Sequence, residues 1–287
     1  MIMGIETSWK LFEVGKTRRD AGALFGEEPR NQWLDNYITM GKENPTEVEK
    51  LSLSRSNHVM LSSNVLLIQT EADTILVDTG TPSITDGFIS EEWTNSKLRA
   101  TLRQHKILSS DITKVILTSL DIDHAGGMVH YDRAGKAVLA FDKATTYYHQ
   151  NDCNRARPRT IARADVAIEL MDKGRTETVT QTTEISPGVF LHPVLGPSGN
   201  GAVVEISRGA DRIYYLADLC PTVFHLHNGV IPSFDDSPES TYLERHQWLQ
   251  AALAEGYLVI FGHGVHVKAG YIEDSKEGLR FKPVLVP

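Results

Sequence analysis

One short stretch constrains the fold of this chain more than any other, because an apolar strand leads directly into residue types that bind metals. Residues 115–118 form an expected buried strand, and Asp121, Asp123 and His124 follow within six positions, ahead of a Gly-Gly pair. Carboxylates and imidazole together suit a divalent first-row metal, and glycine lets the backbone turn closely around one point. Taken alone, the cluster fits an acidic turn with a helix-capping aspartate equally well.

Two more expected strands end in the same way. Asp218 follows the apolar strand 212–216, and His263 follows the strand 257–261. An aspartate after a strand is often only a turn residue, and a single histidine is often only a hydrogen-bonded polar group. The repetition at three strand ends favours a shared site, because loops held by a rigid scaffold are where sites usually form.

The remaining apolar patterns predict strands alternating with helices. The expected strands are 64–69, 74–78, 189–192 and 202–206, the first two forming a hairpin, and the expected helices are 97–105, 141–152 and 159–173. A last helix is expected from Pro238 to Gly256, capped by Ser237, with Tyr242, Leu249 and Leu253 on its face. Residues 11–50 are polar and turn-rich and indicate an N-terminal arm laid over the core. This order fits two sheets flanked by helices.

The motif from Leu117 to Gly127 resembles the His-x-His-x-Asp-His-x-Gly-Gly motif of the metallo-β-lactamase superfamily, and Asp78-Thr79-Gly80 resembles its strand-end Asp-x-Gly. Within that superfamily the chain most resembles the N-acyl homoserine lactonase-like branch. The segments that carry this second resemblance are 22–26 with Pro29 and Trp33, 217–225 and 234–238. The resemblance implies an α/β fold, the αββα four-layer sandwich, as a single domain over 1–287 with residues 1–60 as an arm packed on it.

The resemblance also implies a set of metal ligands, from which this sequence departs. The resemblance implies two metal sites, called metal one and metal two. Ser119 and Asp121 stand where the family has the first two histidines of metal one, and residues 194–200 lack the third, so metal one loses its imidazole ligands. The set for metal two is complete, with Asp123, His124, Asp218 and His263. We therefore expect one divalent ion, zinc first, with manganese or iron as alternatives. A weak second site of oxygen ligands from Ser119 and Asp121 stays open.

The function that the resemblance implies is a mononuclear hydrolase that opens a lactone or ester of a small molecule with a metal-activated water. Asp121 is the expected general base beside the metal ligand Asp123. A histidine of the branch near the substrate mouth matches His225, which implies a pocket-lining role. Two alternatives belong to other classes: a non-hydrolytic iron or manganese enzyme, and a pseudoenzyme that keeps the fold as a binding module.

Composition limits the partners and the compartment. The net charge of −8 argues against nucleic acid or an anionic membrane surface as a partner. No apolar run approaches the roughly 20 residues that cross a bilayer. The 287 residues contain only Cys153 and Cys220, which favours a reducing, cytoplasmic location. Because the lactonase-like branch often pairs its subunits, the resemblance implies a homodimer.

Overall fold

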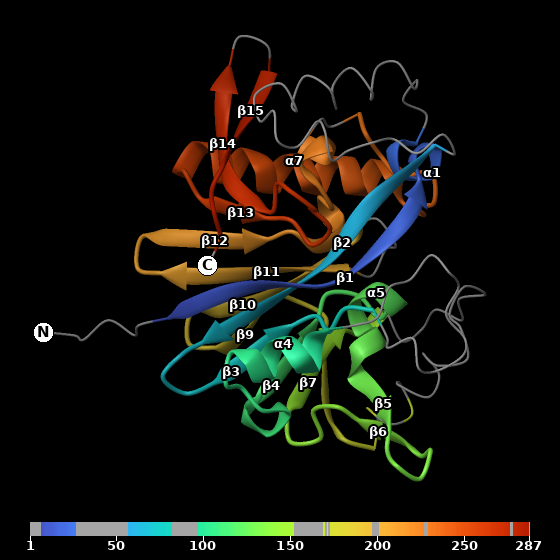
Figure 1. Ribbon diagram of the computed structural model, residues 1–287. Coiled ribbons are helices and arrows are strands. Elements are labelled where there is room, and N and C mark those ends of the chain that lie inside the picture. Colours follow the sequence, from blue (N-terminus) through green and yellow to red (C-terminus); the bar gives the residue numbers. More distant parts are fainter. Residues whose placement is uncertain are drawn as a thin grey trace, which may run out of the picture.

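Two β-sheets lie face to face and form the centre of the molecule (Figure 1). The computed structural model describes residues 7–26, 57–81, 97–151, 169, 171, 173–196, 201–226, 229–275 and 278–286. The first sheet has the order β1-β2-β3-β4-β7-β8, and the second has the order β15-β14-β13-β12-β11-β10-β9. A separate hairpin pairs β5 with β6.

The strands and helices have the following bounds. The first sheet contains β1 (Ser8–Asp20), β2 (His58–Gln69), β3 (Thr74–Val77), β4 (Lys114–Leu117), β7 (Thr145–His149) and β8 (Arg175–Val179). The second contains β9 (Thr183–Ser186), β10 (Val189–Val194), β11 (Gly201–Arg208), β12 (Asp211–Tyr215), β13 (Leu258–Ile260), β14 (Ala269–Ser275) and β15 (Gly278–Pro283). The hairpin strands are β5 (Val129–Tyr131) and β6 (Ala137–Leu139). The α-helices are α1 (Ala21–Phe25), α4 (Leu98–Gln104), α5 (Ile122–Ala125) and α7 (Pro238–Glu255), and the short 3₁₀ turns are η2 (Ser109–Asp111), η3 (Gly126–Met128), η5 (Ala217–Leu219) and η6 (Val223–Leu226).

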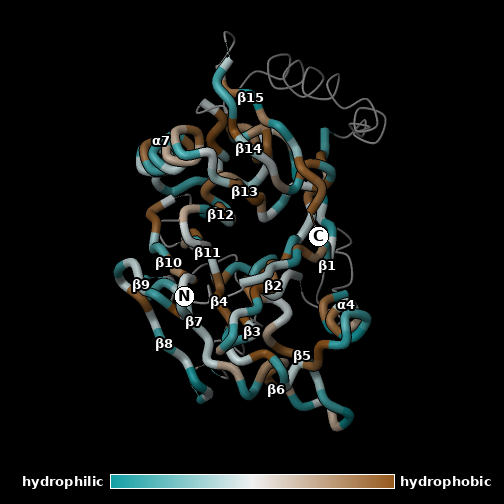
Figure 2. The backbone as a smooth tube through the Cα atoms, turned by 90° about the vertical axis from the view of Figure 1, so that its left-hand side faces the viewer, coloured by the Kyte–Doolittle hydropathy of each residue, from teal (hydrophilic) through white to brown (hydrophobic). Residues whose placement is uncertain are grey.

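Three apolar cores separate four layers. In β2, Leu66 and Ile68 face the second sheet, whereas Val65 and Leu67 pack on the other side, in the core that contains residues 98 and 102 of α4. The second sheet repeats the pattern, since Val204 joins the core between the sheets and Val203 joins the core under α7. Strands buried on both faces need nearly continuous apolar sequence. In Figure 2 the central strands are accordingly browner than β8, whose exposed residues are largely teal.

This arrangement confirms the predicted αββα sandwich and corrects several local predictions. Residues 8–20 are not an arm over the core, because β1 pairs antiparallel with β2 from Ser8 opposite Gln69 to Asp20 opposite His58. Residues 27–56 of the predicted arm lie outside the described part of the chain. Residues 145–149 form a strand instead of the helix expected over 141–152, because parallel pairing with β4 and β8 on both sides outweighs local helical propensity.

The predicted last helix is present as α7, with different details. Gly256 ends it in the left-handed conformation, as expected. Ser237 holds the N-cap position, but its side chain makes no capping hydrogen bond. Tyr242 is exposed, so the predicted face is wrong in part. The buried positions are Thr241, Arg245, Leu249 and Ala252. The predicted helix 159–173 lies almost wholly outside the described residues.

The carboxyl ends of two parallel strand pairs, one from each sheet, meet at one edge of the sandwich. β3 is parallel to β4 in the first sheet, and β12 is parallel to β13 in the second. Backbone hydrogen bonds join the sheets there, from the Ser62 nitrogen to the His263 oxygen (3.1 Å) and from the Asn64 nitrogen to the Gly262 oxygen (3.0 Å). Every polar cluster identified in the sequence follows one of these four strands. None of the described helices has the length and apolar character needed to cross a bilayer.

Candidate metal centre

His124 is held in one orientation by Asp78, which follows β3. The Nδ1 atom of His124 lies 2.9 Å from Asp78 Oδ2, and both side chains are almost fully buried. The same carboxylate accepts from the Thr118 backbone nitrogen (2.8 Å) and from the Tyr215 hydroxyl (3.1 Å). Because a carboxylate oxygen accepts hydrogen bonds, Nδ1 of His124 is the donor in this contact, and Nε2 is the atom that faces the rest of the site.

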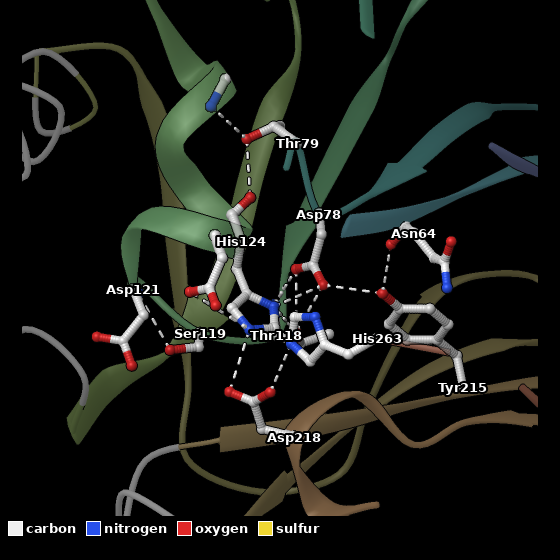
Figure 3. Close-up of polar contacts among 12 residues, drawn as sticks. Asn64, Asp78, Thr79, Thr118, Ser119, Asp121, His124, Tyr215, Asp218 and His263 are labelled. Carbon is white, nitrogen blue, oxygen red and sulfur yellow. Dashed lines mark hydrogen bonds and ion pairs between the residues drawn. The ribbon is translucent and has the colours of Figure 1, made fainter. Parts of the chain in front are cut away.

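His263 follows β13 and is fixed in the same way by backbone. Its Nδ1 atom donates to the carbonyl oxygen of Ser62 at 2.8 Å, and the side chain is 5% exposed. The imidazole rings of His124 and His263 are 5.1 Å apart at an interplanar angle of 83°. Both Nε2 atoms therefore point into one space from two different sheets (Figure 3).

Asp218 closes this space from the turn η5, directly after β12. Its Oδ1 atom lies 2.9 Å from Nε2 of His263, and its Oδ2 atom lies 3.1 Å from Nε2 of His124. Its side chain is 26% exposed, far more than either imidazole. The carboxylate therefore contacts both histidines and also reaches solvent (Figure 3).

Asp123 completes the group from α5. One Oδ atom lies 3.9 Å from Nε2 of His124, and the other lies 3.7 Å from a guanidinium nitrogen of Arg19, near the end of β1. Asp123, His124 and His263 each present one ligand atom, and these atoms lie within 4.8 Å of one another. The structure thus brings together all four residues that the sequence predicts as ligands.

The donors fit a divalent cation. Both Nδ1 atoms donate to acceptors, so both Nε2 atoms face the oxygens of Asp218, and either a proton or a metal ion has to lie between them. The buried Nε2 atom of His124 makes no hydrogen bond of good geometry, which a resident metal explains. Two imidazoles and two carboxylates suit zinc, manganese or iron, and the partners on Nδ1 are those that metal-binding histidines usually have.

Protons compete with a metal for this space. Burial lowers the pKa of His124, but the Asp218 and Asp78 carboxylates outweigh burial and raise it well above its ordinary value. Burial also lowers the pKa of His263, but the Asp218 carboxylate outweighs burial and raises it. Burial raises the pKa of Asp218, yet the two histidines hold it well below its usual range. Metal binding here must therefore displace protons from imidazole.

The residues that replace the family's first histidines do not join this group. Ser119 is buried, and its Oγ atom accepts a hydrogen bond from the Asp121 backbone nitrogen at 3.1 Å. The Asp121 carboxylate points away from His124 and His263 (Figure 3). In the described part of the chain, the one group of three or more histidine, cysteine or carboxylate side chains that could hold a metal is Asp123, His124 and His263. The predicted second site and the general-base role of Asp121 stay predictions, and this geometry weighs against both.

A small, mostly apolar pocket adjoins the centre, and His263 forms part of its wall. Leu24 and Phe25 of α1, Val59 of β2 and Phe224 of η6 line it. The structure corrects the expectation for His225. Its side chain is fully buried, Thr222 Oγ1 contacts Nδ1 (2.9 Å), and the Leu24 oxygen lies 3.3 Å from Nε2. His225 therefore supports the pocket wall from behind.

A family model decides the relationship of this chain to known proteins. The model of the metallo-beta-lactamase superfamily matches residues 59–263, which include every residue of the centre. The chain belongs to the metallo-β-lactamase superfamily. A search of curated proteins by sequence finds no match.

Solved structures share the fold of this chain over most of their length. A probable metal-dependent hydrolase from Staphylococcus aureus superposes with a TM-score of 0.78 at 22% identity, covering 100% of both chains. AidC, a dizinc quorum-quenching lactonase in complex with a product, gives 0.77 at 18% identity, covering 100% of this chain and 97% of its own. A quorum-quenching N-acyl homoserine lactone lactonase gives 0.67 at 18%, covering 92% and 95%. The predicted superfamily and the likeness to lactonases are thereby confirmed, and family membership supports an enzyme of the metallo-hydrolase class.

Sequence analysis missed the residues that orient the two histidines of the centre. Asp78 was recognised as part of a strand-end motif, without its contact to His124. Tyr215 carried a usable signal, since a hydroxyl in an otherwise apolar strand needs a buried partner. Ser62 acts through its backbone oxygen, which no side-chain pattern reports.

Proposed function

We propose that this member of the metallo-β-lactamase superfamily is a metal-dependent hydrolase with one divalent ion, held by Asp123, His124, Asp218 and His263. One observation carries the proposal: two buried imidazoles, each fixed through Nδ1, aim both Nε2 atoms at the Asp218 carboxylate. Ligand atoms in this arrangement repel one another unless a proton or a metal ion lies between them, and a divalent ion can bind all of them at once. Zinc is the first choice because it binds histidine nitrogens and carboxylate oxygens, which catalytic zinc sites combine.

When bound, such an ion supplies a water of lowered pKa and polarises a carbonyl oxygen. The protein has to supply a proton acceptor that solvent can reach. The Asp218 side chain is more exposed than the two buried imidazoles that it contacts. We therefore assign the role of proton acceptor to Asp218 in place of Asp121, whose carboxylate points away from the histidines. Arg19, 3.7 Å from Asp123, adds positive charge beside the ligands.

The substrate that we propose is a lactone or ester with an apolar acyl group. The pocket beside His263 is lined mainly by leucine, valine and phenylalanine, with Thr222 and His266 as polar exceptions. An apolar wall next to a polar reacting centre is the usual design of a small-molecule site. Two of the similar structures are lactonases by their descriptions, AidC among them, and they supply the test substrates.

The test begins with the metal content of protein purified without chelator or nickel, measured by mass spectrometry. One equivalent of zinc, lost in His263→Ala and kept in the hairpin variant His130→Ala, is the expected result. Hydrolysis of N-hexanoyl homoserine lactone and of 4-nitrophenyl butyrate is then measured on both variants and the parent. Zinc-dependent turnover of either compound supports the proposal.

Other outcomes separate the alternatives. Two equivalents of metal point to an additional site at Ser119 and Asp121. One equivalent of iron or manganese without hydrolysis favours a non-hydrolytic metal enzyme. No metal, together with a melting temperature that no added ion changes, leaves a binding module and refutes the proposal.

A further inference from the structure

A charged side chain lies at the centre of the buried face of α7. Arg245 is 0% exposed, although arginine is rarely buried without a paired carboxylate. Neighbouring buried positions on the same face are Thr241, Leu249 and Ala252. In the described part of the chain, no carboxylate forms an ion pair with Arg245 within 4.0 Å, and burial lowers the pKa of its guanidinium.

The guanidinium donates to backbone instead. Its Nε atom donates to the carbonyl oxygen of Leu219 at 2.8 Å. Its Nη1 atom donates to the carbonyl oxygens of His225 at 3.1 Å and Val230 at 2.6 Å. One rigid fork therefore ties three separate turns to one point on α7.

The first of these turns carries a metal ligand. Leu219 directly follows Asp218 in η5, so the bond to its carbonyl fixes the backbone beside that carboxylate. The turn continues to Pro221, whose carbonyl oxygen accepts from the His263 backbone nitrogen at 2.9 Å. Asp218 and His263 are thus set relative to each other through a chain of backbone contacts that begins at Arg245.

The other two turns build the pocket wall. His225 ends the segment 222–225, of which Thr222, Val223 and Phe224 line the pocket. Val230 leads to Ser233, whose nitrogen donates to the Ala23 oxygen of α1 at 2.9 Å. Because α1 supplies Leu24 and Phe25 to the same pocket, the guanidinium supports both of its sides.

This arrangement is costly in free energy. The charge is desolvated, and the buried Nη2 atom has no hydrogen-bond partner. Well-packed apolar residues often stabilise a fold as well as or better than a buried charge, so such a group is weak evidence for stability alone. The presence of this buried charge is explained if the hydrogen bonds of Arg245 position the residues of the metal centre.

We propose that Arg245 is a positioning residue that aligns Asp218 for metal binding and couples the metal centre to the pocket wall. This inference rests on the proposed function, because it assigns to the Asp218 turn a role in holding the ion. The expected consequence is a change in metal affinity without a change in any ligand. Partners one shell out from metal ligands typically alter affinity by about 10–100-fold.

The test compares Arg245→Lys and Arg245→Met with Leu249→Ala. Lysine keeps the charge but cannot reach three carbonyls from one ammonium, and it retains a folded variant if methionine does not. Leu249 is buried one turn further along α7, in the apolar core that also contains Leu219, so its truncation destabilises the fold without removing the hydrogen bond to the Asp218 turn. The readouts are the zinc dissociation constant, from competition with a chromophoric chelator, and the melting temperature of the metal-free protein.

We expect zinc binding weakened by about 10–100-fold in both Arg245 variants and by less than about twofold in Leu249→Ala, even where the melting temperatures match. Equal losses in all three variants, or full zinc affinity in Arg245→Lys, would overturn the positioning role while leaving the proposed function intact. A parent protein that binds no zinc refutes both proposals together, so the two failures are distinguishable.

Discussion

Replacing Asp78 by asparagine tests the logic of the metal centre most directly. Asparagine has the same shape, and it tolerates the positive φ of 62° at this position. It offers one acceptor oxygen where the carboxylate offers two. In the parent, Oδ1 accepts from the Thr118 backbone nitrogen at 2.8 Å and Oδ2 accepts from His124 Nδ1 at 2.9 Å. Whichever way the amide is turned, its NH₂ group faces a donor.

The magnitude follows from what that donor loses. A buried hydrogen bond to a charged group contributes about 1.5–3 kcal/mol. If His124 loses its acceptor, its proton moves to Nε2, the atom that the ion requires. If Thr118 loses its acceptor, His124 still exchanges a carboxylate for a neutral amide and becomes a weaker base. We expect zinc affinity to fall by about 10–100-fold, which corresponds to about 1.4–2.7 kcal/mol.

The assay is zinc competition against a chromophoric chelator at pH 7.5. Asp132→Asn provides the matched control, because Asp132 lies in the β5–β6 hairpin, where its side chain accepts from the backbone nitrogens of Ala134 and Lys136. The control should bind zinc like the parent. A folded Asp78→Asn variant with zinc affinity within about twofold of the parent would refute the view that Asp78 prepares His124 for metal.

Three further predictions concern the fold and the loaded site. Burial, then the nearby Arg245, lowers the pKa of His225 to about 3, so the unfolded chain binds a proton below pH 6.5 that the folded chain does not bind. The contribution of His225 to the free energy of unfolding therefore falls by roughly 2 kcal/mol between pH 6.5 and 5, and urea titrations of His225→Gln should lack this part of the pH dependence. A Cβ on Gly196 would lie 2.8 Å from Thr241 Cα, whereas one on Gly229 meets nothing within 4 Å; Gly196→Ala should cost about 1–3 kcal/mol by urea unfolding, and Gly229→Ala should cost less than about 0.5 kcal/mol. Chelator should lower the melting temperature of the parent and leave that of His263→Ala unchanged, because only a protein that binds metal is stabilised by it.

The sequence predicted the strands that carry the site better than the strands at the edge of the first sheet. The runs near β3, β4, β12 and β13 are apolar because both of their faces are buried, and such runs are legible without a structure. The strand β1 mixes Lys10, Glu13, Lys16 and two arginines with apolar residues, which hid it. This strand is ordered by its pairing with β2, which begins more than 35 residues later in the chain. A pattern of neighbouring residues cannot reveal a contact between segments so far apart in the sequence.

The ligands were predictable and their supports were not. Asp123, His124, Asp218 and His263 each follow an apolar strand, a pattern that a reader of the sequence can count. The carbonyl oxygen of Ser62 leaves no mark in the sequence at all. Arg245 did leave one, since Thr241, Arg245 and Leu249 are spaced by four residues and so share a helix face. The helical face proposed from Tyr242 and Leu253 was chosen on hydrophobicity alone, which passed over a buried charge.

The division of the centre between two sheets has a kinetic consequence. Asp123 and His124 come from the first sheet, and Asp218 and His263 come from the second, nearly one hundred residues or more further along the chain. No partly folded chain with a single ordered sheet presents the whole set, so the ion is captured only after the two halves have docked. Interactions that form after the rate-limiting barrier slow unfolding and leave the folding rate unchanged. Zinc would then prolong the lifetime of the finished protein without helping it to fold.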